Sequence, residues 1–297
     1  MKVVCVGHST FDTTLPMDFY PTENFKYRIH NHIECGGGPA SNGAYLLAKW
    51  GMDTTIMSIV GDDYYGQQIV KEFSDIGANT EYLEVHSGYM TPSSYIIANM
   101  GNGSRTVITS KKDPIRKLTH SGVVNADVIL IDGEHPETAE EVLLQNPDAI
   151  SILDAGRLTD DTKHLGKLVK YLVCSKEFAE KFAGRKIDAS DIDSAIYCYE
   201  KLKEYFNNTV VITLEDKGSF TKFNGYEVIP TIKVKTLDST GAGDIFHGAF
   251  AYFISNGYSL KDTIHYSSVT SAISVTRIGA RNSIPTLDEV LHYDEII

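Results

Sequence analysis

One stretch near the C-terminal end decides how this 297-residue chain is organised: Leu237-Asp238-Ser239-Thr240-Gly241-Ala242-Gly243-Asp244-Ile245-Phe246-His247-Gly248-Ala249-Phe250. Two glycines around Ala242 let consecutive backbone N–H groups converge. The apolar periodicity that begins at Ile245 predicts a helix start there, which places these N–H groups at the positive end of a helix dipole. The stretch therefore predicts an anion-binding loop.

Asp244 adds a carboxylate at the same place. Two interpretations are open for it: a first-turn residue that suits the helix dipole, or a base beside the bound anion. An isolated aspartate before a helix favours the first interpretation. Two further motifs in the chain reverse that preference.

The composition is that of an ordinary globular chain, with 42 % hydrophobic and 22 % charged residues. The 27 basic and 39 acidic residues leave a net charge of −12, and no basic block would follow a phosphate backbone. We therefore expect no nucleic-acid partner. The cysteines, Cys5, Cys35, Cys174 and Cys198, are scattered without a CxxC pair, which predicts buried thiols in a reducing compartment.

The N-terminal residues pass directly into the apolar run 3–7, which is too short for the hydrophobic region of a signal peptide. No stretch approaches the roughly 18 apolar residues of a membrane span. We expect a cytoplasmic protein with no membrane partner.

Apolar strands alternate with helical segments along most of the chain, which predicts an α/β fold with a mostly parallel sheet. The expected strands are 3–7, 54–60, 128–131, 150–153, 172–174 and 210–214, with a hairpin of 219–223 and 226–229. The expected helices include 43–50, 64–76, 245–255 and 260–276, with a short piece after Pro285.

Two segments depart from this alternation. Residues 13–35 are polar and aromatic without a helical period, and resemble an exposed antiparallel excursion. Segments 93–99 and 105–109 flank Gly101-Asn102-Gly103 and predict a hairpin. His30 and His32 lack a third ligand, so we expect them on one face of a strand and not at a metal.

A second glycine-rich helix start, Gly36-Gly37-Gly38-Pro39-Ala40-Ser41-Asn42, lies nearly the whole chain away from the first. Neither a GxxxxGK[ST] loop nor a dinucleotide fingerprint is present. In an open α/β sheet both helix starts meet at the carboxyl edge of the strands. One would hold phosphate and the other a small polar ligand.

The glycine-rich runs resemble the two signatures of the ribokinase (PfkB) family of carbohydrate kinases. Residues 37–42 with Ala44, Gly51 and Gly61 match the first signature, and 238–251 match the second. Residues 275–285 are similar to the tail of ribokinase, so the resemblance spans 3–285. It implies one three-layer α/β/α ribokinase-like domain over 1–297, with a small β-sheet lid at approximately 13–35 and 91–110.

The resemblance also implies a phosphoryl transfer from ATP to a sugar hydroxyl. Asp244 would take the hydroxyl proton, while the N–H groups of Gly241, Ala242 and Gly243 hold the charge on the transferred group. Magnesium would arrive with ATP.

On the sugar side, the family pattern points to Asp12, Gly37, Gly38 and Asn42 as hydroxyl-binding groups. Asp132, Glu134 and Arg157 follow strand ends and could join them.

For the nucleotide, residues 213–218 resemble the family's TLGxxG turn with Glu215 in place of the glycine. Ser175 begins the run that stands where the family has NxxE, with both signature residues missing. The implied nucleotide-binding residues are Ser175, Thr213, Glu215, Gly218 and Ser268. The residues that match a potassium site of ribokinase are Asp238, Thr240, Ser274, Arg277, Gly279 and Ser283.

The substrate that the motifs favour is a ketohexose such as fructose, because Ala40-Ser41-Asn42 and Ile131-Asp132-Gly133 are similar to the ketohexokinase and fructokinase branches. The sulfofructose kinase branch is also similar, but the acid Glu134 stands near the place of its sulfonate-binding arginine. A nucleoside kinase of the adenosine kinase type stays open, with Tyr20, Phe25, Tyr27 and Tyr95 as candidate lid aromatics. A sugar acid kinase and a non-catalytic sugar sensor are further alternatives, and family lids that pair suggest a homodimer.

Overall fold

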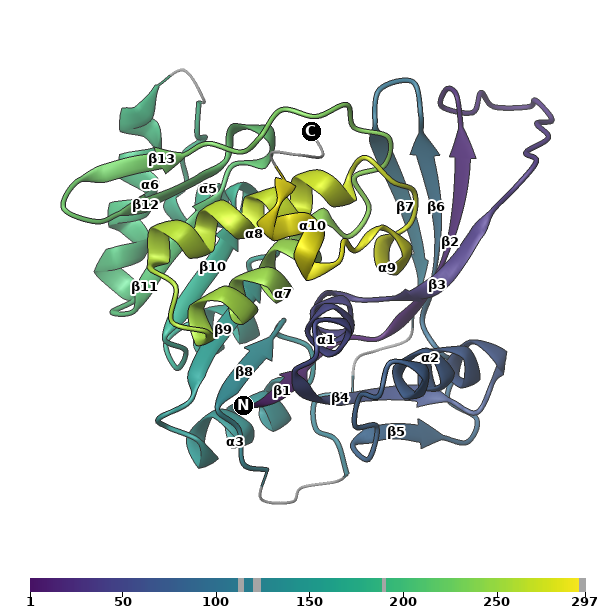
Figure 1. The fold of residues 1–297 in the computed structure, drawn as a ribbon, viewed down its shortest axis with the longest axis horizontal. Coiled ribbons are helices and arrows are strands. Elements are labelled where there is room, and N and C mark those ends of the chain that lie inside the picture. Colours follow the sequence, from purple (N-terminus) through teal and green to yellow (C-terminus); the bar gives the residue numbers. More distant parts are fainter. Residues whose placement is uncertain (112–114, 120–123, 189–190, 294–297) are drawn as a thin grey trace.

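A nine-stranded sheet forms the centre of the computed structural model, which describes residues 1–111, 115–119, 124–188 and 191–293. Its strand order is β13-β12-β11-β10-β9-β8-β1-β4-β5 (Figure 1). The parallel strands are β1 (Lys2–Val6), β4 (Asp53–Gly61), β5 (Leu83–His86), β8 (Val128–Ile131), β9 (Ile150–Ala155), β10 (Tyr171–Ser175) and β11 (Thr209–Thr213). The hairpin of β12 (Ser219–Lys222) and β13 (Tyr226–Ile229) adds an antiparallel edge. The predicted mostly parallel sheet is confirmed.

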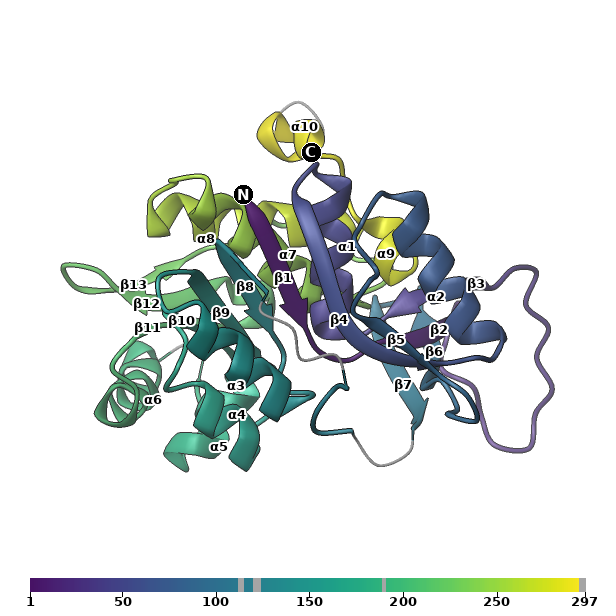
Figure 2. The ribbon, with the colours of Figure 1, turned by 90° about the horizontal axis from the view of Figure 1, so that it is seen from below.

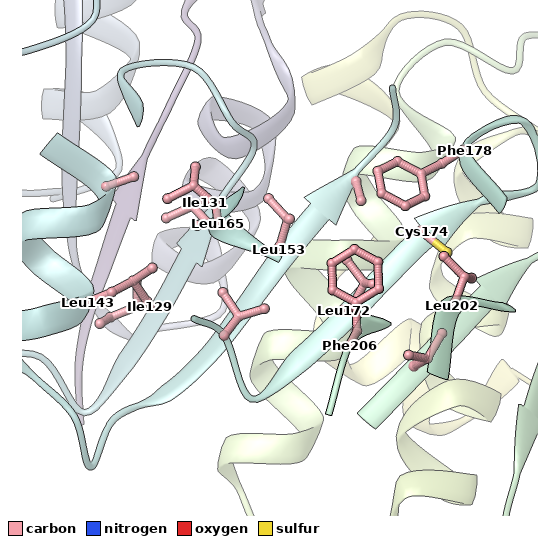
Figure 3. Close-up of a cluster of buried hydrophobic side chains, with 14 of the residues drawn as sticks. Ile129, Ile131, Leu143, Leu153, Leu165, Leu172, Cys174, Phe178, Leu202 and Phe206 are labelled. Atoms are coloured by element: carbon pink, nitrogen blue, oxygen red, sulfur yellow. The ribbon is translucent and has the colours of Figure 1, made fainter. Parts of the chain in front are cut away.

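Both faces of this sheet are buried, which explains why its strands are continuous apolar runs. Alternate residues enter different clusters: Ile129 and Ile131 point to one face, and Val128 and Leu130 to the other. Figure 3 shows the first cluster, where Phe178 and Phe206 cover the strand residues. The four cysteines are free and buried, as predicted.

Helices cover the two faces and complete three layers (Figure 2). One face carries α3 (Pro136–Gln145), α4 (Asp160–Leu165), α5 (Lys176–Ala183) and α6 (Ile192–Tyr205). The other carries α1 (Pro39–Lys49), α2 (Tyr64–Asp75), α7 (Ala242–Ser255), α8 (Leu260–Ser274) and α10 (Leu287–Leu291). The short α9 (Ala280–Ser283) and the strand β5 were not expected from the sequence. Residues 294–297 of the predicted domain lie outside the described residues.

A second sheet of four strands forms the lid, in the order β3-β2-β6-β7. Its strands are β2 (Thr10–Met17), β3 (Ile33–Gly37), β6 (Ser93–Asn99) and β7 (Ser104–Ser110). The two predicted excursions each form an antiparallel pair, and a parallel pairing of β2 with β6 joins them. This parallel pairing was not predicted, because the two segments are far apart in the sequence.

The expected strand position of His30 and His32 is wrong. Both residues lie in the irregular segment between β2 and β3, and His32 Nε2 is 3.7 Å from Glu34. Among the described residues, no group of three His, Cys, Asp or Glu side chains is placed to hold a metal ion.

Two helices begin earlier than predicted, and both starts bear on the site. Helix α7 begins at Ala242, because Gly241 adopts a φ of 73° and its carbonyl accepts the first helical bond from Ile245 N–H. Helix α1 begins at Pro39, directly after Gly38. Asp244 therefore lies inside the first turn of α7. Of the described helices, none is long and apolar enough to cross a membrane.

Candidate active site

Helices α1 and α7 cross at two glycines, and this contact brings the two glycine-rich helix starts together. A Cβ atom on Gly248 would lie 2.9 Å from the Cα of Gly43, closer than real Cβ atoms tolerate. The absence of side chains at both positions lets the backbones approach each other. Asn42 and Asp244, one and four residues away from this contact, consequently face each other.

The anion loop before α7 is held by Asp238. One oxygen of its carboxylate accepts bonds from the Thr240 N–H at 2.9 Å and hydroxyl at 2.6 Å, and the other accepts from Gly279 N–H at 2.9 Å. The Ala242 N–H donates to the Ser239 carbonyl at 3.4 Å. Since the first N–H groups of a helix have no intrahelical partner, those of Gly243 and Asp244 stay available to a ligand. The loop can therefore offer backbone N–H groups at a helix start to a phosphate group.

Asp244 presents a carboxylate next to these N–H groups. Its Oδ2 accepts a hydrogen bond of 2.7 Å from Asn42 Nδ2. Burial and the nearby Asp154 raise the pKa of Asp244 to about 6, against the opposing effects of Asn42, Arg105 and His247. The carboxylate is therefore ionised at neutral pH and close to the range in which it accepts a proton.

Arg281 was missed by the sequence reasoning, although it orients Asn42. Its guanidinium donates to Asn42 Oδ1 at 3.3 Å, Ser41 Oγ at 2.7 Å and Glu72 Oε2 at 2.5 Å. Only 2 % of this arginine is exposed, and Glu72 lies far away in the sequence. The spacing of charged residues along the chain gives no signal for such a pairing.

Asp12 lies on β2, on the lid side of the site. It is buried, and its Oδ1 has no hydrogen-bond partner among the described residues, which is costly unless a ligand supplies one. Burial raises the pKa of Asp12 to about 7, and the charge of Asp244 adds to this rise. The two carboxylates, on β2 and on α7, therefore lie close enough to interact electrostatically.

Gly37 and Gly38 lie where a side chain would not fit. A Cβ atom on Gly37 would be 2.1 Å from Asp12 Oδ2, and one on Gly38 would be 2.1 Å from the His8 carbonyl oxygen. Gly38 also has a φ of 100°, which an L side chain rarely adopts. The structure thus brings the four residues predicted for the sugar, Asp12, Gly37, Gly38 and Asn42, to one place.

The three further candidates for the sugar-binding site, Asp132, Glu134 and Arg157, have different surroundings. Asp132 accepts bonds from the backbone N–H groups of His8, Ala40 and Glu134, so it fixes the start of α1. Burial raises the pKa of Asp132 to about 7. Glu134 is 3.4 Å from Lys111 Nζ, whereas Arg157 is exposed.

The residues predicted for the nucleotide gather at the ends of β10 and β11, except Ser268. Ser175 and Thr213 are register partners, and Ser175 Oγ caps α5 by accepting from Phe178 N–H at 3.0 Å. Glu215 adopts a φ of 55°, so the turn keeps a left-handed conformation, which glycine adopts without strain. Gly218 closes the turn by accepting from Leu214 N–H at 2.7 Å. Ser268 lies on α8 and is 5 % exposed.

Of the residues predicted for potassium, Asp238 and Gly279 are bonded to each other, and the Ser274 carbonyl accepts from Arg277 N–H at 3.0 Å. The Arg277 side chain pairs with Glu289, and the Ser283 hydroxyl donates to the Ala280 carbonyl at 2.7 Å. The donor set contains one carboxylate together with carbonyl and hydroxyl oxygens. Such hard oxygen donors fit an alkali cation by type.

The arrangement as a whole suits transfer of an anionic group to a hydroxyl. It combines helix N–H groups that can hold the anion, a carboxylate that can accept a proton, and a second buried carboxylate that can bind a hydroxyl.

Comparisons with known proteins agree with this chemistry. A family model described as pfkB family carbohydrate kinase matches residues 1–287. The chain is 26 % identical to a ribokinase of Haemophilus influenzae, over 98 % of this chain and 97 % of that protein. Its fold is similar to that of a ribokinase from Thermotoga maritima, with a TM-score of 0.80, 24 % identity and 99 % coverage of both chains. It is also similar to a ribokinase from Cryptococcus neoformans in complex with ADP, with a TM-score of 0.79, 20 % identity and coverage of 98 % and 99 %.

Proposed function

The chain belongs to the pfkB family of carbohydrate kinases, and from this membership we propose that it phosphorylates a hydroxyl of a small neutral ketose, with a ketohexose such as fructose as its substrate. The family makes it an ATP-dependent phosphotransferase with an alcohol group as acceptor. The relatives reported above are named ribokinases, so the identity of the sugar is the open part of the proposal.

One observation carries the sugar-binding proposal: Asp12 is buried, and one of its oxygens accepts no hydrogen bond from the part of the chain that the structure describes. A sugar hydroxyl would donate to this oxygen and remove the cost of leaving it unpaired. The second N–H of the Asn42 amide, next to the one that binds Asp244, would serve a neighbouring hydroxyl. Glycine at 37 and 38 lets the backbone lie directly against Asp12 and the His8 carbonyl, where a side chain would displace the Asp12 carboxylate.

In the proposed mechanism, Asp244 receives the proton of the attacking hydroxyl. An aspartate is a weak base toward an alcohol, but phosphoryl transfer depends more on positioning and charge stabilisation than on early deprotonation. The N–H groups of Gly241, Ala242 and Gly243 would stabilise the charge on the phosphoryl group. Bound magnesium, arriving with ATP, would neutralise phosphate charge.

The nucleotide would lie along the ends of β10 and β11, against Ser175, Thr213, Glu215 and Gly218, with Ser268 beside the adenine. Ser175 supports this as the N-cap of α5, because the start of a helix attracts phosphate.

A screen of acceptors for ADP release tests the proposal. We expect ketohexoses to stimulate ATP turnover more than pentoses, sugar acids, sulfofructose or nucleosides, with Asp244→Asn as the matched inactive control. A higher kcat/KM for ribose would overturn the ketose assignment and leave the kinase in place. If no acceptor stimulates turnover, the kinase function fails.

Potassium activation is a separate part of the proposal and rests on the oxygen donors around Asp238. We expect a higher kcat in potassium than in tetramethylammonium buffer at equal ionic strength. Equal rates in the two buffers would remove the cation from the mechanism.

A nucleoside kinase is the second candidate, because Tyr20 and Phe25 are 54 % and 69 % exposed on the segment between β2 and β3. Tyr95 does not support it. By its register next to Ser94, Tyr95 lies on the opposite lid face from Asp12. Adenosine in the same screen separates this candidate from the sugar kinase.

A further inference from the structure

Asp154, on β9, and His247, on α7, lie beneath the first turn of α7. We propose that they are positioning residues: His247 orients the peptide at Gly243, and its positive charge balances the buried charge of Asp154 beneath Asp244. The inference deepens the proposed function, since it rests on Asp244 as the base that accepts the hydroxyl proton.

Each ring nitrogen of His247 faces oxygen acceptors. Nδ1 is 2.6 Å from the Gly243 carbonyl oxygen and 3.0 Å from Asp154 Oδ2, and Nε2 is 3.1 Å from the Val173 carbonyl oxygen. Carbonyl and carboxylate oxygens can only accept, so both nitrogens must carry a proton. His247 is therefore an imidazolium. In agreement, Asp154 and these carbonyls raise the pKa of His247 to about 9, although burial lowers it.

The imidazolium of His247 compensates the charge of the buried Asp154 carboxylate. Asp154 is 6 % exposed and His247 is 4 % exposed, and an ionised carboxylate is buried only when it is paired. Three elements meet at the pair, because β9 supplies Asp154, β10 supplies the Val173 carbonyl and α7 supplies His247.

The pair is connected to the site through one peptide group. The Gly243 carbonyl that His247 binds belongs to the same planar unit as the N–H of Asp244. Fixing that carbonyl also fixes the direction of an N–H group in the first turn of α7. The hydrogen bond thereby helps to aim the Asp244 N–H, which follows directly after the anion-binding N–H groups of 241–243.

The second connection is electrostatic. The charged groups that face Asp244 are Asp12 from β2, Arg105 from β7, and Asp154 with His247 from below, while Arg281 reaches it through Asn42 of α1. Asp154 alone would favour protonated Asp244, and the imidazolium of His247 opposes that effect. Removing only His247 leaves an unbalanced carboxylate beneath the base.

The test is the pH dependence of kcat at saturating ATP and sugar for His247→Gln, Asp154→Asn and the double variant. We expect His247→Gln to move the acid limb of kcat upward by about one pH unit. The double variant, which removes both charges, should return the limb to the wild-type position. His135→Gln is the control, because His135 is also buried but lies on the far side of the sheet, before α3. It should lower the melting temperature without moving the limb.

Stability supplies a second readout that does not use turnover. Because the folded pKa of His247 lies above its unfolded value, its stabilisation is fully present below pH about 6.5 and lost as pH rises through about 9. The melting temperature of the wild type should fall over this range more than that of His247→Gln. An equal decrease in the melting temperatures of the wild type and His247→Gln would contradict the proposed ion pair.

An acid limb of His247→Gln that coincides with the wild type, or a double variant that does not restore it, would overturn the electrostatic role. Failure of the proposed function is distinguishable, because it appears as ATP turnover that no acceptor stimulates, whereas near-normal turnover in Asp244→Asn would show that another group is the base.

Discussion

At the scale of single residues, three aspartates of the site differ in what their oxygens contact. Asp132 accepts hydrogen bonds from three backbone N–H groups and Asp244 from the Asn42 amide, while one oxygen of Asp12 has no partner within the described ranges. A fully bonded carboxylate holds the backbone, whereas one with free acceptor capacity can bind or react. The number of protein donors therefore separates a structural aspartate from the two that we assign to the substrate.

The first prediction concerns Asp244 as the base. Asp244→Asn should lower kcat by on the order of 10² to 10⁴, because the amide keeps the shape but cannot accept the proton. ATP binding, measured by calorimetry, should stay near the wild-type value. A turnover within a few-fold of the wild type would show that another group acts.

The pH dependence of the wild-type enzyme belongs to the same residue. The base works deprotonated, and its pKa is raised to about 6, so kcat should be constant above neutral pH and fall as pH drops through about 6. The measurement is kcat at saturating substrates between pH 5 and 8. A profile flat through pH 5 would contradict the raised pKa.

Asp12→Asn should separate stability from function. The pKa of Asp12 is raised from 3.8 to about 7 in the folded chain, so ionisation of this carboxyl destabilises the fold by an amount that grows between these two pH values and stays constant above about 7. The amide removes this cost, and the variant should unfold at higher temperature than the wild type at pH 8, with a smaller difference at pH 5. The gain would be on the order of 1 to 4 kcal/mol. The KM for the sugar should rise at the same time, and a lower melting temperature at pH 8 would contradict the prediction.

At the scale of elements, the sequence predicts most helices and strands because their apolar periods are strong. It also predicts that both glycine-rich helix starts meet, since carboxyl ends of parallel strands share one edge. The start of α7 was placed three residues late, because apolar periodicity does not register Gly241 as a cap. Arg281 was missed because its partners Asn42 and Glu72 are distant in sequence and become neighbours only in the fold.

The crossing of α1 and α7 gives the element-scale prediction. In Gly248→Ala the added methyl would meet the Gly43 backbone, which cannot move as a flexible side chain would. We expect a loss of about 1 to 3 kcal/mol in unfolding free energy. Turnover should also fall, because separating the helices lengthens the bond from Asn42 to Asp244.

Gly225→Ala is the matched control for this prediction, since a Cβ at that position would meet nothing within 4 Å. Chemical denaturation and kcat of the two variants should be compared. Equal stability of Gly248→Ala and Gly225→Ala would show that the helices can separate without cost.

At the scale of the whole molecule, the lid sheet presents two different faces. The inner face carries Asp12 and Arg105, because their register partners on β6, Ser94 and Ala98, lie on the same face of that strand. Arg105 donates to the Ser239 carbonyl at 2.6 Å. This contact joins the lid to the anion loop. The outer face carries Tyr95 and Ile108, which are register partners and are 46 % and 58 % exposed.

The outer face gives the last prediction, that two copies of the chain pair through their lids. Strand β7 is an edge strand, and exposed apolar residues beside an unpaired edge favour association. Light scattering after size exclusion should give twice the chain mass of 32.8 kDa for the wild type. Ile108→Glu should give the monomer mass, because association would bury its charge, whereas Ile192→Glu, on α6 and also exposed, should remain dimeric. A wild type at the monomer mass would contradict the pairing, and a dimeric Ile108→Glu would place the interface elsewhere on the molecule.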